Sequence, residues 1–347
     1  MAFEGVRTGT TRRRVLTIGA SAVVAPFTPA IVSAVGQTRI KLRIVNSGSN
    51  TVLTMQELVR QQGFFEQFGL DVETTNLSDG NKVAAALISG DVEACMLAGF
   101  SQVIPAIAKG APLKIIAGAL LKSNSVIYSS RPGIQSVRDL TGKTIGVGSV
   151  GSNLYWLVSE VLRRHGVDPR TVNFVNVGSG TDVFKAVAAG VVDAGPAQVE
   201  FTDSAKKMNV HPLPDGAFWE QLPDYADQGS YTVDRTIRMK RDTIVRLLAA
   251  YGQLYRFVSS PDSKDAYLKA RLTALGPKSS VPDGVALWDF IQKYQPYAVN
   301  LALSPTQVEA AQKINIEAGI QRKMLPYTDV VDPSLAADAV KLMGGPV

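Results

Sequence analysis

The sequence is poor in the residues that build cross-links and metal centres. Among 347 residues it has one cysteine, Cys95, and two histidines. A single cysteine cannot form an internal disulfide, and its place in the strand-like run 92–97 favours a small buried side chain. We find no metal-ligand spacing, no G-x-S-x-G elbow and no nucleophile beside a base. We therefore expect no metal, no cofactor and no catalytic residue.

Charge is also scarce, at 19% of residues. The 36 Lys and Arg against 30 Asp and Glu give a net charge of +6. Residues 1–34 carry four of the bases and one of the acids, so removing this segment would leave +3. The basicity of the full sequence therefore says little about nucleic acid, and we expect no nucleic-acid partner.

The first 34 residues predict an export signal. Arg12-Arg13 lie in a run that resembles the twin-arginine motif, and 16–34 carries no charge. The segment ends in Val32-Ser33-Ala34, a small-residue cleavage pattern. A transmembrane anchor is the alternative, but Pro26 and Pro29 disfavour a stable span. We predict a twin-arginine signal peptide over residues 1–34, cut near Ala34, and a mature protein in the periplasm.

A binding-type turn lies near the middle of the chain, at 143–153. It follows a β-favouring run and opens a helix over 154–166, whose apolar residues recur every three or four positions. Free N–H groups and the helix dipole suit such a turn to an oxyanion or a polar ligand edge. Its glycines also spell G-x-G-x-x-G, but the next strand ends in Gly178-Ser179-Gly180 without the carboxylate that a dinucleotide needs.

The same unit occurs earlier in the chain. A strand at 40–45, a polar turn at 46–50 and a helix over 52–68 repeat the pattern, and AAALISGDVEA at 84–94 answers AVAAGVVDA at 186–194. Two copies of a βαβαβ unit predict an α/β fold with two lobes. We assign residues 35–126 and 230–347 to lobe 1 and residues 127–229 to lobe 2, with irregular structure and one short helix over 201–227.

The candidate binding residues follow from this fold. Ligands of parallel α/β units lie beyond the carboxyl ends of the strands, where the turns here are rich in Ser, Gly, Asn and Thr and carry one charge, Asp79. The serines and asparagines also suit helix N-caps, Glu200 suits a cap on the next helix, and the aromatic residues suit the core. The candidates are Ser49, Asn50, Gly80, Asn81, Gly99, Phe100, Ser149, Gly151, Ser152, Asn153, Ser179, Thr181, Glu200 and Tyr231.

Several motifs resemble one family. They are Gly63-Phe-Phe-Glu-x-x-Gly-Leu70, Gly90-Asp-Val-Glu, Gly190-Val-Val-Asp, Gly110-Ala-Pro-Leu-Lys-Ile-Ile and the run from Gly133 to Val147. Together they look like the nitrate, taurine and alkanesulfonate type of ABC-transporter solute-binding proteins. The resemblance implies a two-lobed periplasmic-binding-protein (type II) fold with a cleft between the lobes. It also implies a monomer that delivers a small solute to a permease in the inner membrane.

Two questions stay open at this level. Related folds include enzymes of the desulfinase and pyrimidine-precursor synthase type, whose chemistry depends on a cysteine or histidine. The solute could be a sulfonate, nitrate, a carboxylate or an N-heterocycle. The absence of Arg and Lys from the turns argues against a multiply charged anion, and Asp79 and Glu200 would suit an amine.

The export signal yields the first prediction. Replacing Arg12 and Arg13 by Lys should leave uncut precursor in the cytoplasm, because the twin-arginine pair is the recognised element of the signal. Cell fractionation followed by mass measurement of the mature protein checks this. Unchanged export of the double variant would contradict it.

Overall fold

The computed structural model describes residues 38–77, 80–100, 102–148, 152–276 and 281–347. The predicted signal segment 1–34, the charged turn residue Asp79 and the candidate residues Ser149 and Gly151 lie outside the described residues. Contacts divide the chain into residues 1–37 and a compact unit of residues 38–347.

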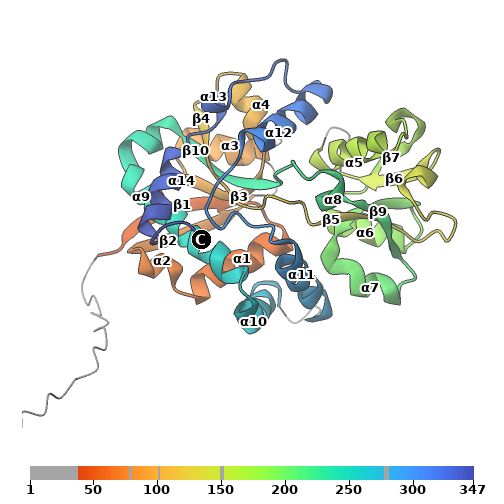
Figure 1. The fold of residues 1–347 in the computed structure, drawn as a ribbon, viewed down its shortest axis with the longest axis horizontal. Helices are drawn as coiled ribbons and strands as arrows, with labels where there is room; N and C mark the ends of the chain where they lie inside the picture. Colours follow the sequence, from red (N-terminus) through yellow and green to blue (C-terminus); the bar gives the residue numbers. More distant parts are fainter. Residues whose placement is uncertain (1–37, 78–79, 101, 149–151, 277–280) are drawn as a thin grey trace, which may run out of the picture. The chain divides into compact units, whose positions relative to one another are not determined.

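Two five-stranded sheets form the framework (Figure 1). The first has the order β2-β1-β3-β10-β4 and the second the order β7-β6-β8-β5-β9. In each, the second strand of the order pairs in parallel with both neighbours, and the fourth pairs antiparallel with both. The strands are β1 (Ile40–Asn46), β2 (Leu70–Asn76), β3 (Ala94–Gly99), β4 (Leu113–Gly118), β5 (Ser125–Ser129), β6 (Thr144–Val147), β7 (Asn173–Asn176), β8 (Ala194–Gln198), β9 (His211–Ala217) and β10 (Gln228–Val233).

Helices connect and cover these strands. The α-helices are α1 (Asn50–Gln61), α2 (Phe64–Gln67), α3 (Gly80–Ser89), α4 (Val103–Ala108), α5 (Asn153–Arg164), α6 (Gly180–Ala188), α7 (Thr202–Lys207), α8 (Phe218–Gln221), α9 (Asp234–Val258), α10 (Lys264–Leu275), α11 (Val281–Tyr294), α12 (Pro305–Glu317), α13 (Tyr327–Val330) and α14 (Ser334–Leu342). Four 3-10 turns complete the described elements: η1 (Val137–Leu140), η2 (Pro169–Thr171), η3 (Val199–Phe201) and η4 (Pro261–Ser263).

The predicted internal repeat is confirmed. The order β1, α1, β2, α3, β3 in the first sheet matches β6, α5, β7, α6, β8 in the second, and the matched strands hold the same places in their sheets. The matched helices α1 and α5 also have the same kind of N-cap. The side chains of Ser49 and Ser152 each accept a hydrogen bond from the backbone N–H three residues further along the chain. The unit is therefore α/β with two lobes, as predicted.

The expectation of irregular structure over 201–227 is only partly right. The short helix is present as α7, but β9 and α8 follow it. The prolines at 212 and 214 concealed the strand, because proline cannot donate to a β-ladder. They are tolerated because β9 lies at the edge of its sheet.

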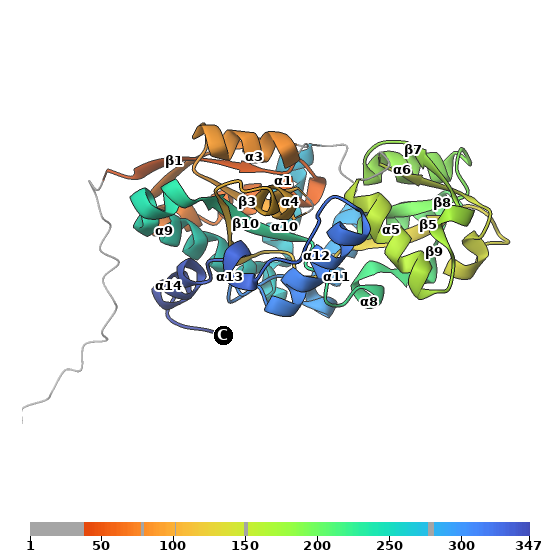
Figure 2. The ribbon, with the colours of Figure 1, turned by 90° about the horizontal axis from the view of Figure 1, so that it is seen from above.

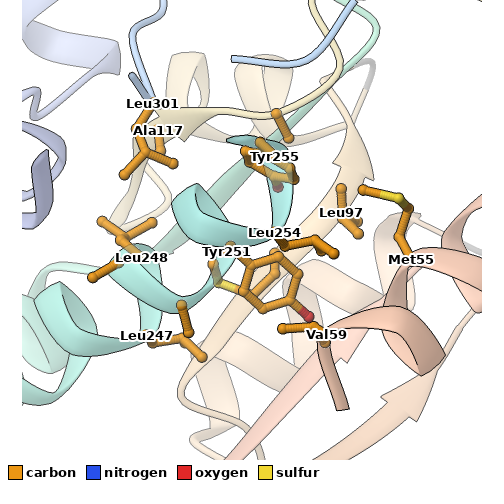
Figure 3. Close-up of a cluster of buried hydrophobic side chains, with 14 of the residues drawn as sticks. Met55, Val59, Leu97, Ala117, Leu247, Leu248, Tyr251, Leu254, Tyr255 and Leu301 are labelled. Atoms are coloured by element: carbon orange, nitrogen blue, oxygen red, sulfur yellow. The ribbon is translucent and has the colours of Figure 1, made fainter. Parts of the chain in front are cut away.

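Alternating side chains of the first sheet enter two cores. Ala94 and Met96 of β3 pack with α1, α9 and α14, whereas Cys95 packs with α3 and α4. The two groups of helices therefore cover opposite faces of the sheet (Figure 2). The buried face of α9 meets Met55 and Val59 of α1 and Leu97 of β3 (Figure 3).

This packing predicts that shortening one buried side chain of α9 destabilises the protein strongly. Leu254 of α9 is fully buried in the cluster, so Leu254→Ala should lower the free energy of unfolding by about 2–5 kcal/mol through lost burial and a cavity. Urea denaturation followed by circular dichroism measures it. Met239→Ala on the same helix is the control, because Met239 is 75% exposed. Equal effects of the two variants would refute the assigned burial of α9.

Candidate functional site at the carboxyl ends of the two sheets

A cavity of about 410 Å³ lies where elements of both sheets meet. On the side of the first sheet, the turn after β1 and the start of α1 line the cavity. On the side of the second sheet, the start of α6, the end of β8 and η3 line it. Its described lining is almost wholly neutral and polar: Ser47, Gly48, Ser49, Asn50, Thr51, Ser179, Gly180, Thr181, Gln198 and Glu200.

The end of β1 is held rigidly beneath this cavity. The buried Asn46 accepts hydrogen bonds on Oδ1 from the backbone N–H groups of Met96 and Leu97, at 3.3 and 3.1 Å. Its amide nitrogen donates to the Tyr251 hydroxyl of α9, and the next residue, Ser47, donates its N–H to the Leu97 carbonyl. The turn that lines the cavity therefore starts from a fixed backbone position.

Two helix N-termini contribute unpaired donors to the cavity. Ser49 caps α1, and Ser179 caps α6 in a capping box with Asp182. These caps satisfy one orphan N–H of each helix. The N–H groups of the first two residues of each helix, Asn50 with Thr51 and Gly180 with Thr181, have no acceptor among the described residues. Four amides, with the positive ends of two helix dipoles, are thus available to a negative or polar ligand edge.

A buried ion pair closes one side of the cavity. Glu200 of η3 and Arg271 of α10 are 1% and 4% exposed, and Arg271 Nη1 lies 2.9 Å from Glu200 Oε2. The Asn50 side chain donates to Glu200 Oε1 at 3.3 Å. Glu200 thus joins the second sheet to α1 and α10, which cover the first. Because Arg271 compensates its charge, Glu200 adds polarity to the cavity without a net negative charge.

A second contact between the two parts lies nearby. Helix α11 packs against η3 and α7, and the Ser204 hydroxyl of α7 donates to the Asp283 carboxylate of α11 at 3.0 Å. Both contacts involve helices from the C-terminal third of the chain. These helices therefore help to set the distance between the two walls of the cavity.

Five of the candidate residues line the cavity: Ser49, Asn50, Ser179, Thr181 and Glu200. Among the other described candidates, Gly80 and Asn81 begin α3 and Gly99 ends β3. Ser152 caps α5, and Asn153 Oδ1 accepts a hydrogen bond from the Tyr225 hydroxyl at 2.9 Å. These five serve helix ends and a strand end.

The two aromatic candidates are buried in the core. Phe100 and Tyr231 are each 2% exposed, and the Phe100 ring occupies the space above Gly229, where a Cβ would come within 2.4 Å of it. Tyr231 is a residue of β10, and its hydroxyl contacts the Cys95 thiol. Packing against neighbouring strands, which the sequence left as the alternative for Phe100, accounts for both positions.

Besides Ser47, Gly48 and Gly180, which lie in predicted polar turns, three residues of the site were not singled out from the sequence. Thr51 and Gln198 line the cavity, and Gln198 lies over Gly180, where an added Cβ would approach its amide within 2.8 Å. A polar residue at the end of β8 was a usable signal. No sequence signal pointed to Arg271, because its pairing with Glu200 joins positions far apart in the sequence.

The site lacks an ionisable thiol. Cys95 is fully buried in β3, and burial raises the pKa of its thiol to about 12. It is therefore a neutral thiol at physiological pH and a poor nucleophile. In the part of the chain that the structure describes, no group of three or more Cys, His, Asp or Glu side chains is arranged to hold a metal.

Comparison with known proteins agrees with this architecture. The family described as NMT1/THI5 like matches residues 51–263, more than half of the chain. No curated protein matches the sequence. Among solved structures, the periplasmic aliphatic sulphonate binding protein SsuA from Escherichia coli superposes with a TM-score of 0.69 at 17% identity, covering 84% of this chain and 92% of its own.

Two other solved structures with the same fold are a binding protein and an enzyme. The alkanesulfonate-binding protein SsuA from Xanthomonas axonopodis pv. citri, bound to MOPS, gives a TM-score of 0.65 at 18% identity over 86% of this chain and 97% of its own. The desulfurization enzyme DSZB gives 0.61 at 15% identity over 86% and 99%. These likenesses confirm the periplasmic-binding-protein fold. Binding proteins and an enzyme share it.

The buried ion pair generates a prediction about stability. Arg271→Met should lower the free energy of unfolding by about 3–5 kcal/mol, because it leaves the Glu200 carboxylate buried without a countercharge. Adding Glu200→Gln should recover part of the loss. Arg170→Met is the control, since Arg170 pairs with Asp168 on the surface and should unfold close to wild type. Urea denaturation of the four proteins measures this, and similar midpoints for Arg271→Met and the control would contradict it.

Proposed function

This chain belongs to the NMT1/THI5-like family, and we propose that it is the periplasmic solute-binding component of an ABC importer. The observation that carries the proposal is the cavity at the carboxyl ends of both sheets, with unpaired amides of α1 and α6 on opposite walls. A site divided between two lobes closes when a solute bridges them. Binding is thereby coupled to a shape that a permease distinguishes from the empty protein.

The proposed lobes are residues 35–126 with 230–347 and residues 127–229. Segments 119–124 and 218–227 connect the sheets and would act as the hinge. The protein works as a monomer in this proposal, exported by the twin-arginine route to the periplasm, with the inner-membrane permease as its partner. In the described residues, no helix is both long and apolar enough to span a bilayer.

The chemistry of the cavity supports a small organic acid or a polar heterocycle. Amide N–H groups at two helix ends suit a sulfonate, nitrate or carboxylate, and the neutral side chains Ser47, Thr51 and Gln198 add hydrogen bonds of either polarity. The cavity volume of about 410 Å³ suits a solute of modest size. We infer that specificity comes from hydrogen-bond geometry rather than from a dedicated cationic side chain.

The competing hypothesis is an enzyme on the same fold, and it is supported by the structural similarity to the desulfurization enzyme DSZB. The buried thiol of Cys95, with its pKa of about 12, argues against cysteine-dependent chemistry. His165 and His211 contact Gln221 and the Ile134 carbonyl in lobe 2, and neither lines the cavity. A binding protein therefore accounts for the described site better than a hydrolase does.

Two measurements test the proposal together. Mass spectrometry of small molecules released on denaturing the purified protein identifies any retained solute, and calorimetry ranks a panel of sulfonates, carboxylates, nitrate and N-heterocycles. We expect one class to bind in a 1:1 ratio and to be recovered unchanged. Chemical conversion of the bound compound would support the enzyme instead.

The role of the amides predicts the effect of one variant. Thr181→Asp puts a carboxylate in the first turn of α6, facing the cavity. It should weaken binding of an acid about a hundredfold, through one lost charge-assisted hydrogen bond and like-charge repulsion. Its thermal midpoint should stay near wild type, because an acidic residue suits a helix N-terminus.

A matched control exists on another helix. Thr306 holds the same second position in α12, behind a serine cap and away from the cavity. Thr306→Asp should leave the affinity unchanged. If calorimetry gives equal affinities for both variants, the α6 terminus does not hold the solute.

A further inference from the structure

The Arg271 guanidinium is buried with unused hydrogen-bond donors. Arg271 is 4% exposed, and its Nη1 lies 2.9 Å from Glu200 Oε2. Nevertheless, Nε and Nη1 of Arg271 and Oε2 of Glu200 have no aligned hydrogen-bond partner among the described residues. Pairs of arginine and carboxylate are strongest when two N–H···O bonds run in parallel. This pair therefore neutralises two charges without using the directional donors of the guanidinium.

Packing holds the guanidinium behind Glu200. Gly284 of α11 leaves room for the Arg271 side chain, since a Cβ at that glycine would lie 2.9 Å from Arg271 Cδ. The Tyr267 hydroxyl, one turn earlier on α10, acts on the guanidinium and is also buried without an aligned partner among the described residues. These three residues lie outside the lining of the cavity, whereas Glu200 belongs to it. Glu200 therefore stands between the cation and the solute site.

The charges of this wall cancel. Glu200 is the one charged side chain among the described lining residues, and the guanidinium behind it carries the opposite charge. An entering acid thus meets helix N-termini and neutral groups but no net cation. Because both groups are buried, water screens little of either charge if its partner is removed.

We propose that Glu200 masks the charge of Arg271 and thereby limits the affinity of the cavity for acids. The inference rests on the proposed solute-binding function and adds a determinant of how tightly that site holds an acidic solute. The amides of α1 and α6 orient the acid, and the internal carboxylate neutralises the cation that would otherwise attract it. A protein that hands its solute to a permease needs such a limit, because tighter binding mostly means slower release.

Four proteins that differ in charge test the inference. Relative to the wild type, Glu200→Gln makes the wall more positive, Arg271→Met makes it more negative, and the double variant leaves its net charge unchanged. Calorimetry with ethanesulfonate and with propanoate measures the affinities. Glu200→Gln should bind about tenfold or more tighter than the wild type, the double variant about as tightly as the wild type, and Arg271→Met most weakly.

Two controls isolate the effect of charge. The uncharged ethanesulfonamide and propanamide should bind Glu200→Gln no more tightly than they bind the wild type. Asp193→Asn makes the same change of charge at a more exposed pair, where Asp193 contacts Arg131 at 3.0 Å away from the cavity. This variant should keep the wild-type affinity for ethanesulfonate.

Thermal stability supplies an independent readout. Glu200→Gln leaves a buried guanidinium without a countercharge, so the ligand-free variant should melt below the wild type. Ethanesulfonate brings a negative charge, and it should raise the melting temperature of Glu200→Gln by more than that of the wild type. If Arg271→Met alone does not fold, its addition to Glu200→Gln should still abolish the gain in affinity.

The outcomes separate the two claims. If neither the wild type nor Glu200→Gln binds either anion, and no acid is released on denaturation, the proposed binding of acids fails and this inference fails with it. If an acid binds but Glu200→Gln holds it no more tightly than the wild type, the function stands and the inference is overturned. A gain in affinity that survives in the double variant overturns it as well.

Discussion

The charge of Glu200 must be compensated where the two sheets meet, and much of the arrangement depends on how that is done. Glu200 follows β8 in the second sheet, whereas its partners Arg271 and Asn50 belong to helices that cover the first. A buried carboxylate needs both a countercharge and hydrogen bonds to be tolerated. Satisfying it here fixes the end of β8 against the start of α1, so one electrostatic requirement defines a wall of the cavity.

The polar character of the cavity follows from the same arrangement. Because Arg271 forms an ion pair with Glu200, the cavity presents backbone amides and neutral side chains rather than a free guanidinium. Serine caps satisfy one N–H of each helix and leave the first two available.

Much of the fold was predictable from the sequence because local signals agreed with the global repeat. Paired strand, turn and helix patterns predicted both βαβαβ units, which the structure confirms. Strand β9 was missed because its prolines look like a loop until its edge position is known.

The site was predictable only in part, for a physical reason. Ser49 and Ser179 carry a local capping signal, and their turns follow parallel strands, so their place at the cavity could be expected. The pairing of Glu200 with Arg271 is a property of tertiary contacts. The residues next to Glu200 and Arg271 in the sequence do not indicate that these two side chains pair. The same limit explains why the candidates Phe100 and Tyr231 are core residues.

The central claim is that amides of α1 and α6 together hold the solute. A titration of ¹⁵N-labelled protein with the tightest-binding acid, followed by amide NMR, examines those groups directly. The account predicts that the largest shifts fall on Asn50, Thr51, Gly180 and Thr181 and saturate together at one equivalent. Saturating shifts that leave these four amides unmoved would contradict it.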